Sequence, residues 1–178
     1  MKRLPLLLYL LLLVAAPVFI TGTAFASNLG NVAATVTPQN ISVNVTDGAV
    51  TYGTLGLSLS QDTTAAALND TQTATNNGNV AETFNITSTN ATGGTGWTLA
   101  GTIGADAFKH SFCNTGTGTP DPCDATPTWT AMTTSYSTLG TNIAAAGTSK
   151  FDLKLDTPSS TSDYTAKTIT VTVQAIAF

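Results

Sequence analysis

The sequence is short of charge, and the little it has is of a restricted kind. Only 9% of the 178 residues are charged, and there is one histidine, His110, and one glutamate, Glu82. After the basic start at residues 2–3 there is no arginine, and only four lysines follow. Nucleic-acid binding depends on clustered Lys and Arg that neutralise phosphates, so the sequence argues against nucleic acid and against an anionic membrane surface as partners.

The same scarcity bears on catalysis. Nucleophilic and acid–base chemistry need a base tuned near neutral pH together with an orienting group, and glycoside hydrolysis needs paired carboxylates. His110 stands beside the cysteine loop, and the aspartates fall mainly at turns, where their side chains make local hydrogen bonds. We therefore expect no enzyme activity, no catalytic residue and no cofactor, with His110 as an ordinary surface or packing residue.

Cysteine is also rare, since Cys113 and Cys123 are the only two, and they close a loop rich in Gly, Pro and Asp. In an exported chain we expect a disulfide between them, which stabilises by about 2–3 kcal/mol in the chain-entropy treatment. The alternative, a metal pair, lacks ligands, because structural zinc takes four Cys or His residues. Asp106, Asp121 and Asp124 are a weak candidate set for Ca²⁺, which prefers oxygen ligands, and a solvated loop is the default.

The chain does have an apolar run at its start. Basic residues 2–3 precede an uncharged, mostly apolar stretch over residues 4–20, and an A-x-A pattern follows at 24–26. This order is typical of a secretory signal peptide cleaved after Ala26, so we expect a secreted protein of the cell surface, with membrane contact only through residues 1–26 before cleavage. A retained anchor is the alternative, since about 20 apolar residues can span a bilayer.

Past residue 30 the sequence alternates short apolar and polar runs between Gly, Asn, Asp and Pro turns. Asp47-Gly48 is a two-residue hairpin signal, and folding it would place Val45 opposite Val50. The apolar positions then change from even to odd numbers, and a strand cannot change faces without an extra residue. We therefore expect a bulge or bend near Gly53.

The rest of the chain is organised around the stretch Thr71 to Thr87, in which two Thr-rich runs flank a compact Asn-Asn-Gly-Asn turn at 76–79. Pairing the runs across this turn matches apolar residues poorly, so we expect them in different sheets with the turn as the corner. Residues 97–103 predict a strand, 151–156 a half-exposed strand, and 164–177 a final run with one apolar face. No long 3.6-residue period occurs, so the predicted fold is all-β: an antiparallel β-sandwich, jelly-roll or Ig-like Greek key, of roughly 8–10 strands.

Three sequence runs carry a resemblance: TQTATNNGNV at 71–80, FDLKLD at 151–156 and DYTAKTITVTV at 163–173. With the signal peptide and the uncharged N-terminal strand, the chain resembles the small secreted β-sandwiches of prokaryotic cell surfaces. Among these it is similar to TasA/camelysin-like fibre subunits and archaeal bundling pilins. The resemblance implies that an N-terminal strand, here residues 27–37, completes the sandwich of the next subunit, and that residues 38–178 form the sandwich domain.

The composition of the two ends agrees with this reading. The uncharged tract at 27–37 has apolar residues at nearly every second position, and the chain ends with a run that is apolar on both faces. Such a strand must be covered within the subunit or by a neighbour, so donation between subunits and an ordinary strand of a closed sandwich both stay open. The residues expected at subunit contacts are Leu29, Val32, Ala34 and Val36 in the tract and Ile176 and Phe178 at the C-terminus.

We therefore expect an extracellular structural subunit that polymerises with itself by strand donation into a filament, pilus, biofilm matrix or surface layer. The alternative is a monomeric surface adhesin or carbohydrate-binding sandwich that uses Trp97, Trp129 and the cysteine loop to bind other surface proteins or glycans. Five N-x-S/T triplets are candidate glycosylation sites in an exported chain. They begin at Asn40, Asn44, Asn69, Asn85 and Asn90.

Overall fold

The computed structural model describes residues 30, 32–116 and 122–178. The chain divides into two compact units, residues 1–36 and 37–178, and the strands named below all belong to the second. The signal peptide expected over residues 1–26 lies outside the described residues. Within the described ranges, no helix is long and apolar enough to cross a membrane.

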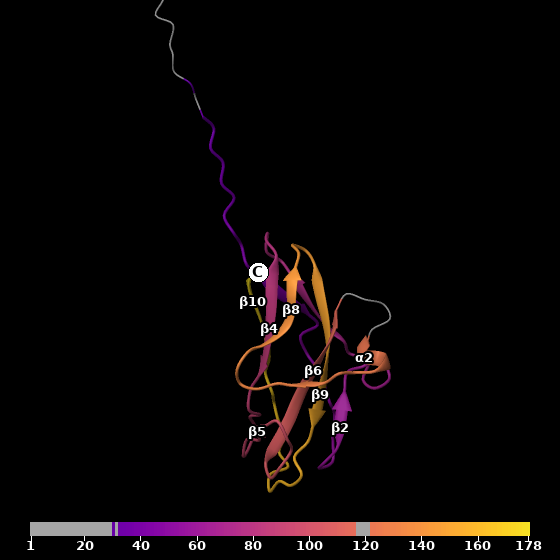
Figure 1. Ribbon diagram of the computed structural model, residues 1–178. Coiled ribbons are helices and arrows are strands. Elements are labelled where there is room, and N and C mark those ends of the chain that lie inside the picture. The colour runs from indigo at the N-terminus through magenta and orange to yellow at the C-terminus, as the bar shows by residue number, and fades with distance from the viewer. Residues whose placement is uncertain (1–29, 31, 117–121) are drawn as a thin grey trace, which may run out of the picture. The chain divides into compact units, whose positions relative to one another are not determined.

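Ten strands in the described part of the chain form two sheets packed face to face (Figure 1). The larger sheet runs in the order β1 (Val43–Thr46), β3 (Gln72–Asn76), β9 (Thr148–Asp156), β6 (Ala107–Gly116) and β5 (Thr98–Leu99), with β2 (Ser60–Asp62) beside β9 and β7 (Thr130–Ala131) beside β6. The smaller sheet runs in the order β10 (Val171–Ala177), β4 (Glu82–Ser88) and β8 (Ser137–Ile143). A one-turn helix, α2 (Pro122–Ala125), follows β6. The predicted all-β sandwich is therefore confirmed.

The stretch that organises the sequence behaves as its pattern predicts. Buried and half-buried residues alternate along both β3 and β4, because each strand turns one face to the core. The two strands lie in different sheets, β3 in the larger and β4 at the centre of the smaller. The turn between them is thus a corner that carries the chain from one sheet to the other.

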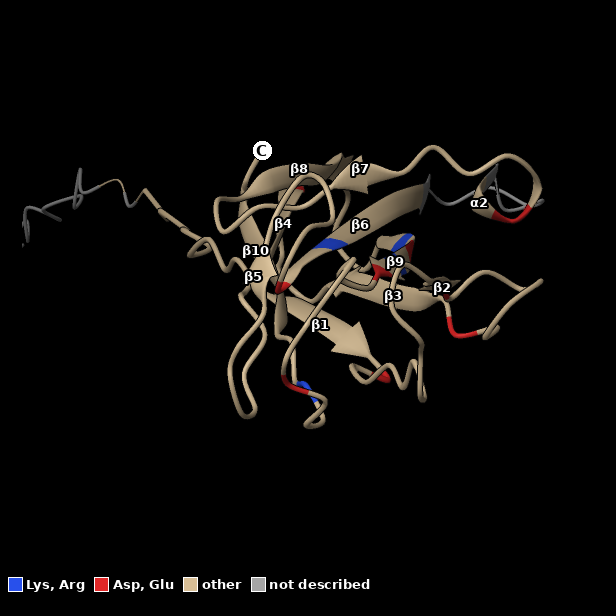
Figure 2. Cartoon of the chain, turned by 90° about the horizontal axis from the view of Figure 1, so that it is seen from below, with Lys and Arg blue, Asp and Glu red and all other residues tan. Residues whose placement is uncertain are grey.

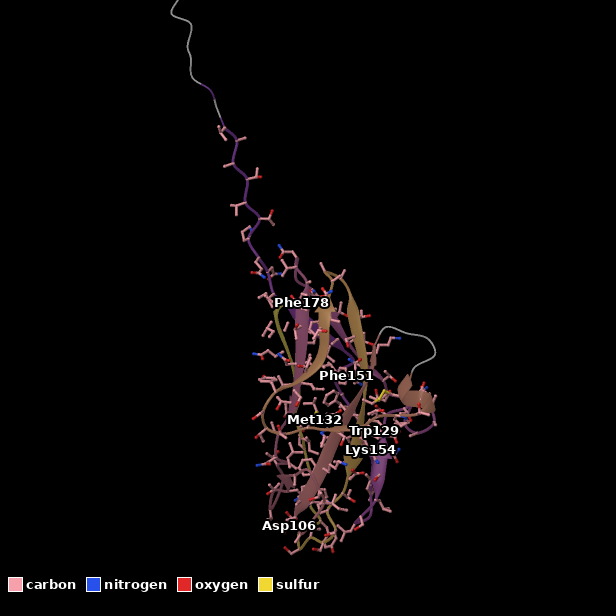
Figure 3. All side chains as sticks on the ribbon, viewed as in Figure 1. Asp106, Trp129, Met132, Phe151, Lys154 and Phe178 are labelled. Carbon is pink, nitrogen blue, oxygen red and sulfur yellow. A yellow bond between two sulfur atoms is a disulfide. The ribbon has the colours of Figure 1, made fainter. Side chains whose placement is uncertain are left out.

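The core fills the space between the sheets in two clusters. The larger includes Phe84, Phe112, Met132 and Phe151, and Figure 3 labels the last two. The smaller is built on Phe108 and Leu155, with Trp97 packed against it. The side chain of Tyr52 packs against both clusters, although no strand contains it.

The hairpin predicted across Asp47-Gly48 is wrong. Both residues have positive φ (73° and 67°), as a tight turn requires, but β1 pairs with β3, so that Val45 faces Ala74 rather than Val50. The sequence indicated the turn and the shared face correctly, since Val45 and Val50 pack on one cluster. A bend is also present where the apolar positions switch, at Gly53, whose φ is +73°.

Two further expectations need correction. The strand predicted over 97–103 is reduced to the two residues of β5. The strand at 151–156 is part of a longer β9, and its outer face is covered at Asp152, which is fully buried, whereas Lys154 on the same face is half-buried as expected. The Asp152 carboxylate accepts hydrogen bonds from the hydroxyls of Thr63 (2.8 Å) and Thr71 (2.9 Å), which cover that face.

The sandwich has two ends, which we call the Asn76 end and the Asp106 end after a residue at each. At the Asn76 end lie the turns at 76–82 and 143–147 and the C-terminus, whose Phe178 amide bonds to Ala81. At the Asp106 end lie β5 and the loop that precedes β10, where Asp106 bonds to Ser160. Figure 3 labels Asp106 and Phe178 toward opposite ends.

Candidate functional site

A groove of about 890 Å³ opens between the two sheets, along the side where β1 and β10 are the edge strands. Its lining is mainly apolar, and Lys167 is the only charged side chain among the lining residues. The apolar residues that line it include Val50, Tyr52, Leu55, Trp97, Leu153, Leu155, Ile169, Val171 and Val173. The groove therefore exposes part of the inter-sheet core along one edge of the sandwich.

One wall of the groove is a segment outside the strands, residues 48–57, which we call the wall segment. Every one of its residues lines the groove. Within the described structure, residues 49–55 make no backbone hydrogen bond, so this length of chain lies beside the sheets without pairing to either. Backbone N–H and C=O groups require partners when water is excluded, so this wall can accept a strand.

The opposite wall is β10 with the residues that lead into it. β10 pairs with β4 through all seven of its residues and has no second partner strand in the described structure. Val171 and Val173 are half-buried and pack on the core, while the backbone groups that point away from β4 form an open sheet edge. The groove thus lies between two lengths of chain that both retain hydrogen-bonding capacity.

A row of three hydrogen-bonded side chains connects the wall segment to both sheets. The Tyr52 hydroxyl lies 2.9 Å from His110 Nε2, and His110 Nδ1 lies 3.0 Å from Ser88 Oγ. His110 belongs to β6 and Ser88 to β4, so the three residues link the wall segment to the larger and smaller sheets in turn. Burial lowers the pKa of His110 to about 4 and raises that of Tyr52, so both are neutral near pH 7.

A second cluster lines the groove toward its Asp106 end. The Lys167 ammonium donates to the carbonyls of Gly93 (2.7 Å) and Thr95 (2.6 Å) and pairs with Asp163 at 2.8 Å. It also lies 5.6 Å from the centre of the Trp97 ring. The hydrogen bonds from Lys167 and Thr165 lower the pKa of Asp163, so the carboxylate stays charged and the lysine is paired. The groove consequently contains no unpaired charge.

The start of the domain, residues 38–42, is fixed at the Asn76 end, and we call it the root segment. The Asn79 side chain donates to the Pro38 carbonyl and accepts from the Asn40 N–H, both at 2.8 Å. Glu82 Oε1 accepts from the Ser42 N–H at 2.8 Å, and backbone bonds from Asn77 and Asn79 complete a set of five. A Cβ at Gly78 would lie 2.4 Å from the Asn40 carbonyl, so only glycine fits beneath this segment.

The residues predicted at subunit contacts are exposed where the structure describes them. Val32 and Val36 are 93% and 89% exposed, Ala34 is exposed, and no strand is present there. Leu29 lies outside the described residues. At the other end of the chain Ile176 and Phe178 are 44% and 69% exposed. The described part of the tract, residues 32–37, is therefore exposed.

The disulfide predicted between Cys113 and Cys123 is present, and it joins the end of β6 to α2. The carboxylates suggested for Ca²⁺ do not meet. Asp106 precedes β6, whereas the disulfide holds Cys123, the neighbour of Asp124, beside Cys113, seven residues further along the strand. At about 3.3 Å per residue, the two carboxylates are roughly 20 Å apart. Asp121 lies outside the described residues, and no group of three metal-ligating side chains occurs in the described ranges.

The remaining predicted positions are dispersed. Trp97 is half-buried at the groove and donates to the Thr161 hydroxyl at 3.2 Å, whereas Trp129 is half-buried just before β7, so the two do not form one exposed aromatic surface. Among the five N-x-S/T asparagines, the one at the centre of the smaller sheet, Asn85, is half-buried. The exposed ones are Asn40, Asn44, Asn69 and Asn90.

Sequence reasoning missed His110 as a bridge between the sheets, although a signal for it exists. Phe108, His110 and Phe112 occupy alternate positions of β6, and all three are buried. That period places the imidazole on the core face. The groove itself has no such local signal, because it depends on which strands become neighbours.

A scan against protein-family models and searches of curated proteins and of solved structures found no match to this chain.

Proposed function

We propose that this chain is an extracellular structural subunit that polymerises, with residues 27–37 of one copy occupying the groove of the next. The observation that carries the proposal is that one chain contains both halves of such a contact. It has an apolar groove between an unpaired segment and the open edge of β10, and it has an uncharged tract whose valines Val32 and Val36 are exposed.

The chemistry of the two halves matches. A strand laid in the groove would gain backbone hydrogen bonds along the edge of β10, which is how β-augmentation obtains its affinity. Its alternate side chains would enter an apolar space, and burying a valine side chain contributes about 1.5–3 kcal/mol. Ordering each residue of the tract costs about 1–2 kcal/mol, so apolar burial and backbone pairing are both needed for a stable contact.

The absence of charge supports the same arrangement. The mature chain is acidic overall, and its few charged residues are scattered, as Figure 2 shows for the described part. No acidic side chain lines the groove, and residues 27–46 carry no charge, so this contact brings no like charges together. A contact between two different surfaces that does not close generates an open filament.

Electron microscopy of two forms of the protein tests the proposal. With the disulfide intact, we expect filaments from a chain that begins at Ser27 and none from a chain that begins at Pro38. Monomers from both forms, or filaments from both, would overturn the proposal. Circular dichroism and thermal unfolding of the shorter form establish that its sandwich is folded.

A matched pair of substitutions removes the ambiguity of a deletion. Ala34→Asp places a carboxylate on the same face as Val32 and Val36, whereas Ala33→Asp places it on the opposite face. We expect the first substitution to abolish filaments and the second to preserve them. Equal behaviour of the two variants would contradict insertion of one face of the tract into the groove.

A further inference from the structure

We infer that the donated strand runs antiparallel to β10, with Val36 beside Ile169, Ala34 beside Val171 and Val32 beside Val173. This inference rests on the proposed function and adds the direction of the strand, which decides whether the groove is filled by another copy or by the chain's own tract. It follows from where the tract is rooted and from which way β10 runs.

The first step is the position of the root. Five hydrogen bonds hold residues 38–42 against the turn at 76–82, so the tract always departs from the Asn76 end of its own sandwich.

The second step is the length of the tract. Its 11 residues can extend to roughly 36 Å at about 3.3 Å per residue, which is close to the length of a single strand such as the nine-residue β9. A tract that first ran back along its own sandwich would have no length left for a neighbour. Donation therefore requires the next copy to lie beyond the Asn76 end.

The third step is the orientation of that copy. Neighbours in an open polymer repeat the same contact, so in a head-to-tail filament the acceptor presents its Asp106 end to the donor's Asn76 end. Residue 37 then enters at the acceptor's Asp106 end, and the N-terminal residues of the tract reach toward its Asn76 end. The strand thus runs toward the Asp106 end in the direction of increasing residue number.

The fourth step is the direction of β10. Val171 pairs with Ser88 and Ala177 with Glu82, and Glu82 adjoins the corner turn, so β10 runs toward the Asn76 end. The donated strand and β10 are therefore antiparallel. Ile169, Val171 and Val173 are all half-buried on the core side, and an antiparallel strand can set its three apolar residues directly opposite them.

A tract that folded into the groove of its own chain would give the opposite result. It would enter at the Asn76 end, where it is rooted, and it would run parallel to β10. Val36 would then lie beside Val173 and Val32 beside Ile169. The two arrangements pair the same residues differently. Whether Val36 lies close to Ile169 or to Val173 therefore distinguishes them.

Disulfide trapping between two copies tests the direction. One copy carries a cysteine in the tract (Val36→Cys or Val32→Cys), and the other carries one in the groove wall (Ile169→Cys or Val173→Cys). Directly opposite residues on paired strands have Cβ atoms about 4.5–5.5 Å apart, close to what a disulfide spans. The native cysteines are 4% and 0% exposed, which protects them from exchange under mild oxidation.

We expect covalent dimers from V36C with I169C and from V32C with V173C, and at least tenfold fewer from the two exchanged combinations. Electron microscopy of each single-cysteine variant shows whether filaments still form. Filaments with the exchanged pairs cross-linked would overturn the direction and leave the proposed function standing. A single chain carrying V36C and V173C that cross-links within itself, without filaments, would overturn both.

Discussion

Two segments flank β1, and they are held in different ways. The root segment, residues 38–42, is tied to the corner turn by five hydrogen bonds that involve its backbone. The wall segment, residues 48–57, has no backbone bonds over residues 49–55 and is held by side chains, chiefly Tyr52. One segment is fixed in place and the other retains its hydrogen-bonding capacity. β1 therefore separates a root segment whose backbone is hydrogen-bonded to the corner turn from a wall segment whose backbone can still pair with another strand.

Removing the amide of Asn76 should have the largest effect, on the fixed side of the comparison. Asn76 is fully buried, and its side chain makes three hydrogen bonds of 2.8 Å, to Val80, Ile143 and Gly78. Asn76→Ala leaves these backbone groups unsatisfied, so we expect a loss of roughly 3–5 kcal/mol in the free energy of unfolding, measured by chemical denaturation.

The neighbouring residue of the same turn provides the control for this substitution. Asn77 is exposed, and its side chain makes no hydrogen bond in the described structure, so Asn77→Ala should change the free energy of unfolding by less than about 0.5 kcal/mol. If the two substitutions cost the same, the corner turn does not depend on the buried amide.

The pH dependence of stability tests the bridge behind the wall segment. The pKa of His110 is about 4 in the folded protein and about 6.5 when unfolded, so the unfolded chain binds more protons between these values. Stability should therefore fall as the pH drops from about 6.5 to about 4, with a contribution from His110 on the order of 3 kcal/mol.

The variant His110→Gln keeps hydrogen-bonding capacity toward Tyr52 and Ser88 but cannot titrate in this range. Carboxylates titrate in both proteins, so the difference between their denaturation curves at pH 7 and pH 4 isolates the imidazole. We expect the variant to lose less stability on acidification than the parent. Identical losses would mean that His110 titrates normally.

The smallest effect should follow from removing one hydroxyl from the wall segment. Tyr52→Phe keeps the ring in the core but loses the hydrogen bond to His110, which should cost about 1 kcal/mol of unfolding free energy and increase protease cleavage within residues 48–57. Tyr136→Phe, at a residue that is 48% exposed, is the matched control and should change little. An unchanged Tyr52→Phe variant would show that packing alone holds this wall.

Much of the fold could be predicted from the sequence because its signals are local. The alternation along residues 72–76 and 82–88 and the Asn-Gly turn between them correctly predicted a corner between two sheets. The hairpin at Asp47-Gly48 failed for the opposite reason. The turn forms, but β1 takes its partner from β3, some 30 residues later, and local sequence does not determine such a choice.

The candidate site was less accessible to sequence analysis. The disulfide was predicted correctly from the only two cysteines, whereas the role of the uncharged tract at 27–37 stays a prediction. The groove was not predicted, because it exists only where the wall segment fails to pair and β10 becomes an edge. Asp152 was misjudged similarly, since the residues that cover it lie about 80 positions earlier in the sequence.

Because β10 comes late in the sequence, the tract and the groove become available for assembly at different times. The strand that forms one wall of the groove comprises residues 171–177, and it pairs with residues 82–88, so this wall cannot form until residue 177 has been synthesised. Pairing between such distant segments folds slowly, typically over milliseconds to seconds. The tract at 27–37, by contrast, is synthesised before every strand of the sandwich. Under the proposed assembly, a newly exported copy can therefore donate its tract to the groove of an existing copy before its own groove can accept a tract. This order favours growth by addition of single copies to an existing end.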